Sequence, residues 1–212
     1  MPRLVDHDER RAQLAAAGIQ IMLREGLDGV TVRGVAAEAG CSTGSLRHYF
    51  ANQSALQEYT VAAATALLRD RVGPRVQRDR PRRSRVEVIA EVVEELLPLD
   101  ENRWEEYRLW NAIAEWERRH LPAGGSQTWA DQRALYQRCI ALLRGHPATL
   151  PDLTDPPVDS EEWLWAGLLH TFVDGLASQL VNTPGEMTAK TAKALLRSLL
   201  AAVPPDERQG PE

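Results

Sequence analysis

A short run of small and hydrogen-bonding side chains carries the clearest chemistry in this sequence. Of its residues only Leu46 must face inward if the run is helical, so the others lie on an exposed face. The hydroxyls of Thr43 and Ser45 can donate to or accept from base edges, and Gly44 lets the backbone approach those edges closely. The run reads Ser42, Thr43, Gly44, Ser45, Leu46, Arg47, His48, Tyr49.

The larger side chains of the same run suit contacts with nucleic acid. Arg47 can place two N–H groups on a guanine or contact a phosphate. His48 and Tyr49 can donate to phosphate oxygens, which fixes register without reading sequence. We therefore predict a recognition helix over 43–49 that enters a major groove, with Arg33 contacting the backbone from the preceding helix.

The elements that position this helix are readable from residue types. Thr31 is a candidate N-cap for a helix with apolar Val32, Val35, Ala36 and Ala39 on one face, and Gly40 is suited to end it. Ser42 is a second N-cap candidate after the corner. This pattern is typical of a helix-turn-helix. A plain helical hairpin with a solvated polar face has the same spacing, so spacing alone leaves both interpretations open.

Residues from about Arg11 to Leu56 resemble the DNA-binding domain of the TetR/AcrR family of bacterial transcriptional regulators. The matching run is EGLDGVTVRGVAAEAGCSTGSLRHYFANQSAL. The resemblance implies an all-α fold, with a three-helix helix-turn-helix domain at 1–52 and a helical ligand-sensing and dimerisation domain at 53–212. In one departure, Gln53 stands where the family often has lysine, so a phosphate contact expected there is weaker or absent.

The resemblance also implies a homodimeric repressor that binds a double-stranded DNA operator and is released by a small-molecule inducer. Such a protein acts in the bacterial cytoplasm at the nucleoid. The chain of 212 residues is 43% hydrophobic, and it contains no apolar run near the roughly 20 residues that span a bilayer, so we expect no membrane association. Cys41 and Cys139 are expected in different domains and are not expected to pair.

Charge restricts how the chain can hold DNA. The formal net charge is -5, which argues against a protein that coats nucleic acid indiscriminately. Residues 1–60 contain six arginines and seven acids, so we expect phosphate contacts to be concentrated at Arg33 and Arg47, with Arg10 and Arg11 as further candidates. Eight arginines between residues 69 and 85 are interpreted as a solvated linker, with a supplementary phosphate patch as the alternative.

Met1 to Arg10 is expected to be a short polar arm, and the long helix that Asn52 caps is expected to end at Gly73-Pro74. Ser84 with Glu87 is a capping-box signature, and Ser126 is a further N-cap candidate. The rest of the chain is predicted to be a succession of helices, because no segment alternates with period two.

Asp159 and Glu162 are expected to open a helix that runs to about Val181, and the last helix is expected from about Thr188 to Val203. Both helices, the first of them between Trp163 and Leu180, look too apolar for one subunit to cover, which favours burial against a second subunit. In the family the last two helices form the dimer interface. The residues assigned to it are Leu164, Leu168, Thr171, Gly175, Leu195 and Leu199. Two copies would place their recognition helices about one DNA turn or a multiple of it apart, on a palindromic operator.

Aromatic side chains in the middle of the sequence are candidates for an inducer site. Trp104, Tyr107 and Asn111 share one helical face, and Trp129 and Tyr136 share another. Facing each other, they could wall a cavity for an apolar ligand, or for a cationic one with Glu105, Glu106 or Glu115 nearby. Aromatic residues at this spacing are also common as plain core.

An enzyme and a protein-binding helical adaptor are the rival classes. His170 and Asp174 are four residues apart on one predicted helix, a spacing that could hold a metal or orient a base. No dense cluster of ligands and no phosphate-binding glycine loop accompanies them, so we predict no catalytic site, no metal and no cofactor. We interpret His170 as a polar residue at the dimer interface.

Overall fold

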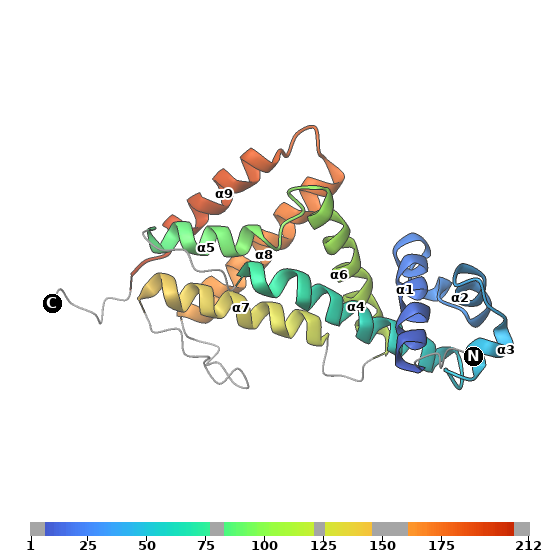
Figure 1. Ribbon diagram of the computed structural model, residues 1–212. Helices are drawn as coiled ribbons and strands as arrows, with labels where there is room; N and C mark the ends of the chain where they lie inside the picture. Colours follow the sequence, from blue (N-terminus) through green and yellow to red (C-terminus); the bar gives the residue numbers. More distant parts are fainter. Residues whose placement is uncertain (1–6, 77–82, 121–125, 146–160, 206–212) are drawn as a thin grey trace. The chain divides into compact units, whose positions relative to one another are not determined.

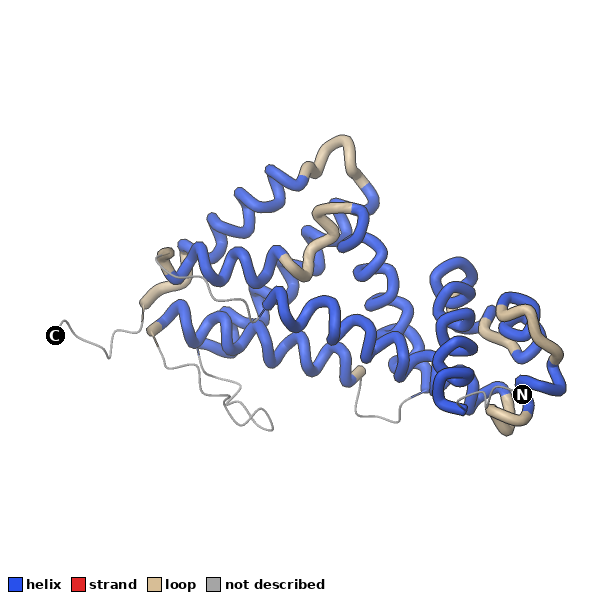
Figure 2. Tube along the Cα trace, in the orientation of Figure 1, coloured by secondary structure: helices blue, strands red, loops and turns tan. Residues whose placement is uncertain are grey.

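The computed structural model describes residues 7–76, 83–120, 126–145 and 161–205, and within these ranges all regular structure is helical (Figures 1 and 2). This confirms the predicted all-α fold. The helices are α1 (His7–Glu25), the 3-10 turn η1 (Leu27–Gly29), α2 (Val32–Glu38), α3 (Thr43–Arg47), α4 (Gln53–Val76), α5 (Arg85–Glu94), α6 (Glu101–His120), α7 (Gln127–Arg144), α8 (Glu161–Asn182) and α9 (Ala189–Ala201).

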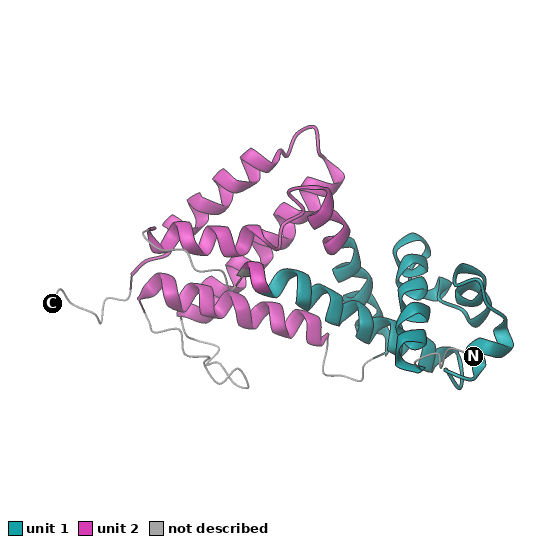
Figure 3. Ribbon diagram, in the orientation of Figure 1, with its two compact units in different colours: residues 1–73, 108–122 teal, residues 74–107, 123–212 magenta. Residues whose placement is uncertain are grey.

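The chain divides into two compact units (Figure 3). Unit 1 comprises residues 1–73 and 108–122, and unit 2 comprises residues 74–107 and 123–212. Helices α4 and α6 each contribute to both. The predicted boundary between residues 52 and 53 concerns function and remains a prediction, since the compact unit around the helix-turn-helix also includes most of α4.

Unit 1 is built around the buried face of α1. Leu14, Ile21 and Met22 are at most 2% exposed and pack with residues of α2, α3, α4 and α6. Helices α1 and α4 lie so close that a Cβ added at Gly18 would be 2.6 Å from Oγ1 of Thr60, which is itself fully buried. A larger residue than glycine at position 18 would therefore push these helices apart.

Helix α1 begins earlier than its sequence suggests. We expected a polar arm from Met1 to Arg10, but the helix starts at His7, while residues 1–6 lie outside the described residues. Asp8 and Glu9 fall in its first turn, where negative charge is favourable at a helix N-terminus. Arg11, a candidate phosphate contact in the sequence, lies over an aromatic ring of its own unit: its guanidinium is 4.5 Å from the centre of the Tyr59 ring.

Unit 2 has its own core between α5, α7, α8 and α9. Ile89, Tyr136, Leu169, Val173 and Leu196 are among its buried residues. Helix α7 packs against α8, and α5 packs against both α7 and α9. The predicted capping box at Ser84 with Glu87 and the predicted cap at Ser126 are present. Thr188, expected only as the approximate start of the last helix, is its N-cap.

The end of α4 differs from the prediction. The helix was expected to end at Gly73-Pro74 but continues to Val76, with Pro74 in its last turn. Arg75 then pairs with Glu106 of α6 and, at 3.2 Å, with Glu95 after α5. Hydrogen bonding to Glu106 raises the pKa of Arg75. These ion pairs give the last turn of α4 partners that a local sequence pattern does not contain.

No helix in the described part of the chain combines the length and apolarity needed to cross a bilayer.

Candidate functional site

Helices α2 and α3 are held at their starts by side-chain caps. The Thr31 hydroxyl accepts from the Gly34 amide at 3.0 Å, and the Ser42 hydroxyl accepts from the Ser45 amide at 3.0 Å. Each cap satisfies one of the amides that a helix N-terminus leaves without a partner. The two predicted N-caps are confirmed.

The corner between the helices is a glycine turn. Gly40 has φ +62°, and the amides of Gly40 and Cys41 donate to the carbonyls of Ala37 and Ala36. This is the Schellman pattern, in which a left-handed residue lets the chain reverse direction after a helix. The turn therefore fixes the direction in which α3 begins.

Helix α3 presents most of its polar side chains to solvent. Leu46 is 0% exposed, whereas Thr43, Gly44, Arg47 and His48 are exposed. The exposed face predicted from spacing is present at these four positions. It is the surface on which the DNA-binding assignment rests.

The helix itself is shorter than predicted. It spans Thr43–Arg47 rather than 43–49, because the amides of His48 and Tyr49 donate three residues back and tighten the last turn. Tyr49 is half-buried, and its ring lies 4.6 Å from the ring of His7. Ser45 is also half-buried, and the hydroxyl of the exposed Ser42 is engaged in its cap. A role for these three side chains on DNA stays a prediction.

Few arginines of the helix-turn-helix region are free to contact phosphate, as expected from the charge composition of residues 1–60. Arg33 and Arg47 are exposed and make no ion pair within the described residues. Arg24 instead forms a two-point contact with Glu38, at 3.1 and 2.8 Å, which joins the ends of α1 and α2. That hydrogen bonding lowers the pKa of Glu38. Gln53, where the family often has lysine, is exposed at the start of α4.

The arginine run between residues 69 and 85 is only partly described, since residues 77–82 lie outside the described ranges. Of the others, Arg75 pairs within unit 2, and Arg83 pairs with Glu91 of α5. These two arginines already have acidic partners in the protein. Contact between the run and DNA remains untested.

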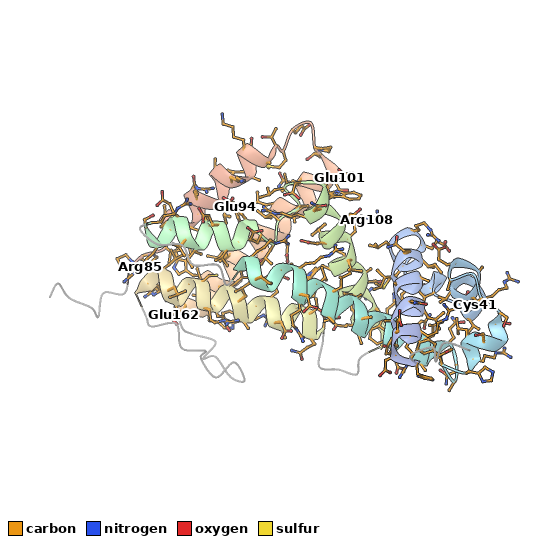
Figure 4. All side chains as sticks on the ribbon, in the orientation of Figure 1. Cys41, Arg85, Glu94, Glu101, Arg108 and Glu162 are labelled. Atoms are coloured by element: carbon orange, nitrogen blue, oxygen red, sulfur yellow. The ribbon has the colours of Figure 1, made fainter. Side chains whose placement is uncertain are left out.

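Side chains from α4 and α6 support the helix-turn-helix from behind. The Gln57 amide donates to the carbonyls of Leu27 and Val30, at 3.2 and 3.3 Å. Arg108, labelled in Figure 4, donates to the Leu23 carbonyl at the end of α1. Arg119 pairs with Asp28 of η1 at 3.1 Å. These contacts hold the segment that enters α2.

The five residues predicted to bind the inducer do not all belong to one unit. Asn111 is exposed and falls in unit 1, whereas Trp104, Tyr107, Trp129 and Tyr136 fall in unit 2. Trp104 is 37% exposed, and Tyr107 packs partly against the core of unit 2. Their joint role as cavity walls stays a prediction.

Trp129 and Tyr136 do come together, and they meet at His170. The imidazole lies 5.0 Å from the Trp129 ring and 5.1 Å from the Tyr136 ring. His170 is 6% exposed, so its predicted place at the dimer interface is wrong: it is buried inside the protomer against α7. Which side of α8 meets α7 is a tertiary fact that helical spacing does not determine.

Two more polar residues complete this cluster, which we call the Trp129 site: Trp129, Gln132, Tyr136, His170 and Asp174. The Gln132 amide donates to the Tyr136 hydroxyl at 2.8 Å, and Asp174 Oδ2 lies 3.5 Å from His170 Nε2. Burial raises the pKa of Asp174 to about 6. Burial, with a contribution from the Arg133 charge, lowers the pKa of His170.

The acids that we proposed for a cationic ligand are placed differently. The buried carboxylate of Glu106 forms an ion pair with Arg75, and the carboxylate of Glu115 accepts hydrogen bonds from Arg118 and Arg119. Both acids therefore already have arginine partners within the protein. Glu105 is exposed. Sequence reasoning noted Asp174 only as a possible metal ligand beside His170 and missed its position next to the aromatic rings. Within the described ranges no three His, Cys, Asp or Glu side chains gather as a metal site needs.

Several of the residues predicted for dimerisation are exposed in the single chain. Leu164 and Leu168 are each 53% exposed one turn apart on α8, and Leu195 on α9 is 39% exposed. Thr171 is exposed on the same stripe of α8, and a Cβ added at Gly175 would meet nothing within 4 Å. Leu199 is half-buried at the edge of the unit 2 core. Leu164 and Leu168, exposed one turn apart on α8, are candidates for a protein–protein interaction surface.

Comparison with known proteins assigns both parts of the chain. Residues 14–59 match the family described as bacterial regulatory proteins, tetR family, and residues 85–205 match the BetI-type transcriptional repressor C-terminal domain. The chain is 32% identical over 199 residues to the HTH-type transcriptional regulator PksA of Bacillus subtilis (strain 168), covering 92% of this chain and 90% of that protein.

Solved structures share the fold. A putative transcriptional regulator from Saccharomonospora viridis, in complex with choline, has a TM-score of 0.65 at 17% identity, covering 92% of this chain and 97% of that one. The multidrug binding protein EbrR, complexed with imidazole, has a TM-score of 0.58 at 25% identity, covering 98% and 96%. With the exposed face of α3, these matches identify the chain as a member of the TetR family of transcriptional regulators, a DNA-binding repressor type rather than an enzyme.

Proposed function

We propose that this chain forms a homodimer that represses transcription by binding a palindromic operator, and that a small-molecule inducer releases it. The observation that supports DNA reading most directly is the face of α3. Thr43, Gly44 and Arg47 are exposed on a capped helix whose inward residue, Leu46, is fully buried. Such a helix can enter a major groove without unfolding its own domain.

The proposed dimer is supported by the apolar face of α8 and α9. Pairing two copies through Leu164, Leu168 and Leu195 would remove three half-exposed leucines per protomer from water. A two-fold axis would give the two α3 helices an inverted arrangement, and the operator would be correspondingly palindromic, with half-sites about 34–36 Å apart or a multiple of that.

The inducer that we propose is a small apolar or cationic molecule bound in unit 2. The related structures carry choline in one case and imidazole in another, which supports a small organic ligand for this fold. The inducer can shift DNA affinity only as far as it prefers the conformation that does not bind DNA. The proposed repressor acts in the bacterial cytoplasm, where it binds its operator on the nucleoid. It is proposed to need no cofactor.

A glycine substitution tests the proposed DNA contact without disturbing the fold. A Cβ at Gly44 would lie 3.8 Å from the Ser42 hydroxyl, an ordinary contact, so Gly44→Ala is expected to leave stability unchanged. If α3 lies against base edges, the added methyl lowers operator affinity by about tenfold or more, which is roughly 1.4 kcal/mol. The measurement is fluorescence anisotropy on an operator selected from genomic fragments.

The matched control is Gly185→Ala, where an added Cβ meets nothing within 4 Å and the position lies between α8 and α9. It should bind the operator as the unaltered protein does. Equal operator affinity in Gly44→Ala and Gly185→Ala would remove α3 from the DNA interface.

A further inference from the structure

The carboxylate of Asp174 is half-buried, and within the described residues no ion pair joins it to a lysine or arginine side chain. Its one charged or titratable neighbour among the ion pairs of the described residues is His170, at 3.5 Å. Burial raises the pKa of Asp174 to about 6, so the group is still ionised at neutral pH. A partly desolvated anion without a partner is unfavourable in the protein alone and becomes favourable when a cation joins it.

His170 does not supply that cation near neutral pH. Burial lowers the pKa of its imidazole, and the nearby Arg133 charge lowers it further. Within the part of the chain that the structure describes, the buried Nε2 atom of His170 and the buried Oε1 atom of Gln132 have no hydrogen-bond partner. A buried polar atom without a hydrogen-bond partner is unfavourable, and a ligand that hydrogen-bonds these two atoms would remove that cost.

The third component is the indole of Trp129, which is 43% exposed beside the same imidazole. The face of an indole attracts cations more strongly than other aromatic faces do. Asp174 and Trp129 both lie against His170, from α8 and α7, so one small ligand can reach both. The charge of Arg133, an exposed residue of α7, lowers the pKa of His170, whereas burial raises the pKa of Asp174.

We propose that the Trp129 site binds a small organic cation, with the Asp174 carboxylate receiving the ammonium group and the Trp129 indole covering it. His170 and Gln132 offer polar atoms to the remainder of the ligand. This inference rests on the proposed function in taking the regulator to respond to a small molecule, and it assigns the charge class and the residues that recognise it. Protonation of Asp174 competes with the cation.

Three probes of one shape and different charge test the proposal. Benzylammonium, benzyl alcohol and benzoate carry charges of about +1, 0 and −1 at neutral pH on nearly the same skeleton. Isothermal titration of the full chain should give benzylammonium an affinity about tenfold or more above that of benzyl alcohol, with benzoate weakest. Equal binding of benzylammonium and benzyl alcohol, a preference for benzoate, or no saturable binding of benzylammonium would each overturn the proposal.

Two matched variants locate the effect. Asp174→Asn keeps the shape of the side chain and removes its charge, so it should bring benzylammonium down to the affinity of benzyl alcohol. Asp131→Asn makes the same change at an exposed carboxylate of α7 that Gln127 already contacts, and it should leave the preference intact. Trp129→Leu should weaken all three probes and benzylammonium most. Retention of the full preference in Asp174→Asn would place the cation elsewhere.

Operator binding is measured on the same samples, so that the two proposals fail separately. If the unaltered chain and Asp174→Asn both bind operator but benzylammonium shows no preference, only the cation site is wrong. If the unaltered chain binds no operator, the proposed function is wrong, whatever the probes do.

Discussion

Replacing one exposed leucine of α8 by a charged residue is predicted to dissociate the proposed dimer. Leu168 is 53% exposed in the single chain, so Leu168→Glu places its carboxylate in solvent in the monomer and should not disturb folding. In a two-fold dimer through this face, however, both copies of the new carboxylate enter the interface. The variant therefore separates a dimer contact from an ordinary surface position.

The expected size follows from the exposed area. Full burial of a leucine side chain contributes roughly 2 kcal/mol, so covering the half of Leu168 that remains exposed contributes about 1 kcal/mol per protomer. Leu168→Glu forfeits about 2 kcal/mol per dimer, and desolvating two unpaired carboxylates adds at least about 2 kcal/mol more. A total near 4 kcal/mol raises the dimer dissociation constant about a thousandfold.

Sedimentation velocity at micromolar concentration measures this change directly. The unaltered chain should sediment as a dimer and Leu168→Glu as a folded monomer with the same circular dichroism. Ala130→Glu adds the same carboxylate at an exposed position of α7 and should remain a dimer. A Leu168→Glu variant that stays dimeric would refute the assignment of this face, as would an unaltered chain that is monomeric.

The remaining predictions concern stability, charge and induction. Gly18→Ala should lower the free energy of unfolding in urea by about 1–3 kcal/mol, because its Cβ would meet Oγ1 of the buried Thr60 at 2.6 Å, whereas Gly73→Ala, with nothing within 4 Å, should not. Asp174→Asn should stabilise the fold by about 1 kcal/mol at neutral pH, after allowance for its partly exposed side chain. The raised pKa means that the folded chain holds this proton more tightly than the unfolded one, so the advantage shrinks as pH falls from about 6 toward 4, and a stability gain independent of pH would contradict it. Operator affinity should depend only shallowly on salt, and a slope equivalent to more than about ten phosphates would show contacts beyond Arg33 and Arg47. Trp104→Ala and Tyr107→Ala should keep operator binding and lose induction, and loss of operator binding in both would remove them from the inducer site.

Features set by neighbouring residues were predictable from the sequence. The caps at Thr31, Ser42 and Ser84 depend on a hydroxyl placed before a helix, and each is present with its amide partner. The turn at Gly40 needs a residue that accepts a positive φ, and glycine supplies it. The exposed face of α3 likewise follows from one apolar residue, Leu46, among polar ones.

Features set by contacts distant in sequence were not predictable. The last turn of α4 passes through Pro74 where Arg75 finds acidic partners on α6 and after α5, and neither partner is near it in the sequence. We predicted His170 at the dimer interface because helical spacing alone does not determine whether its side of α8 faces a second subunit or the core of the same subunit. Its burial against α7, and the raised pKa of Asp174 beside it, appear only once α7 and α8 are packed together.

The claim that α3 reads DNA is tested most directly by sequencing the genomic fragments that the purified protein retains. The account predicts an inverted repeat whose half-site centres lie about 10 base pairs apart or a multiple of that, with Arg47→Ala losing base preference within each half-site while remaining folded. Retained fragments that share no repeat, or an Arg47→Ala variant that selects the same repeat as strongly, would contradict it.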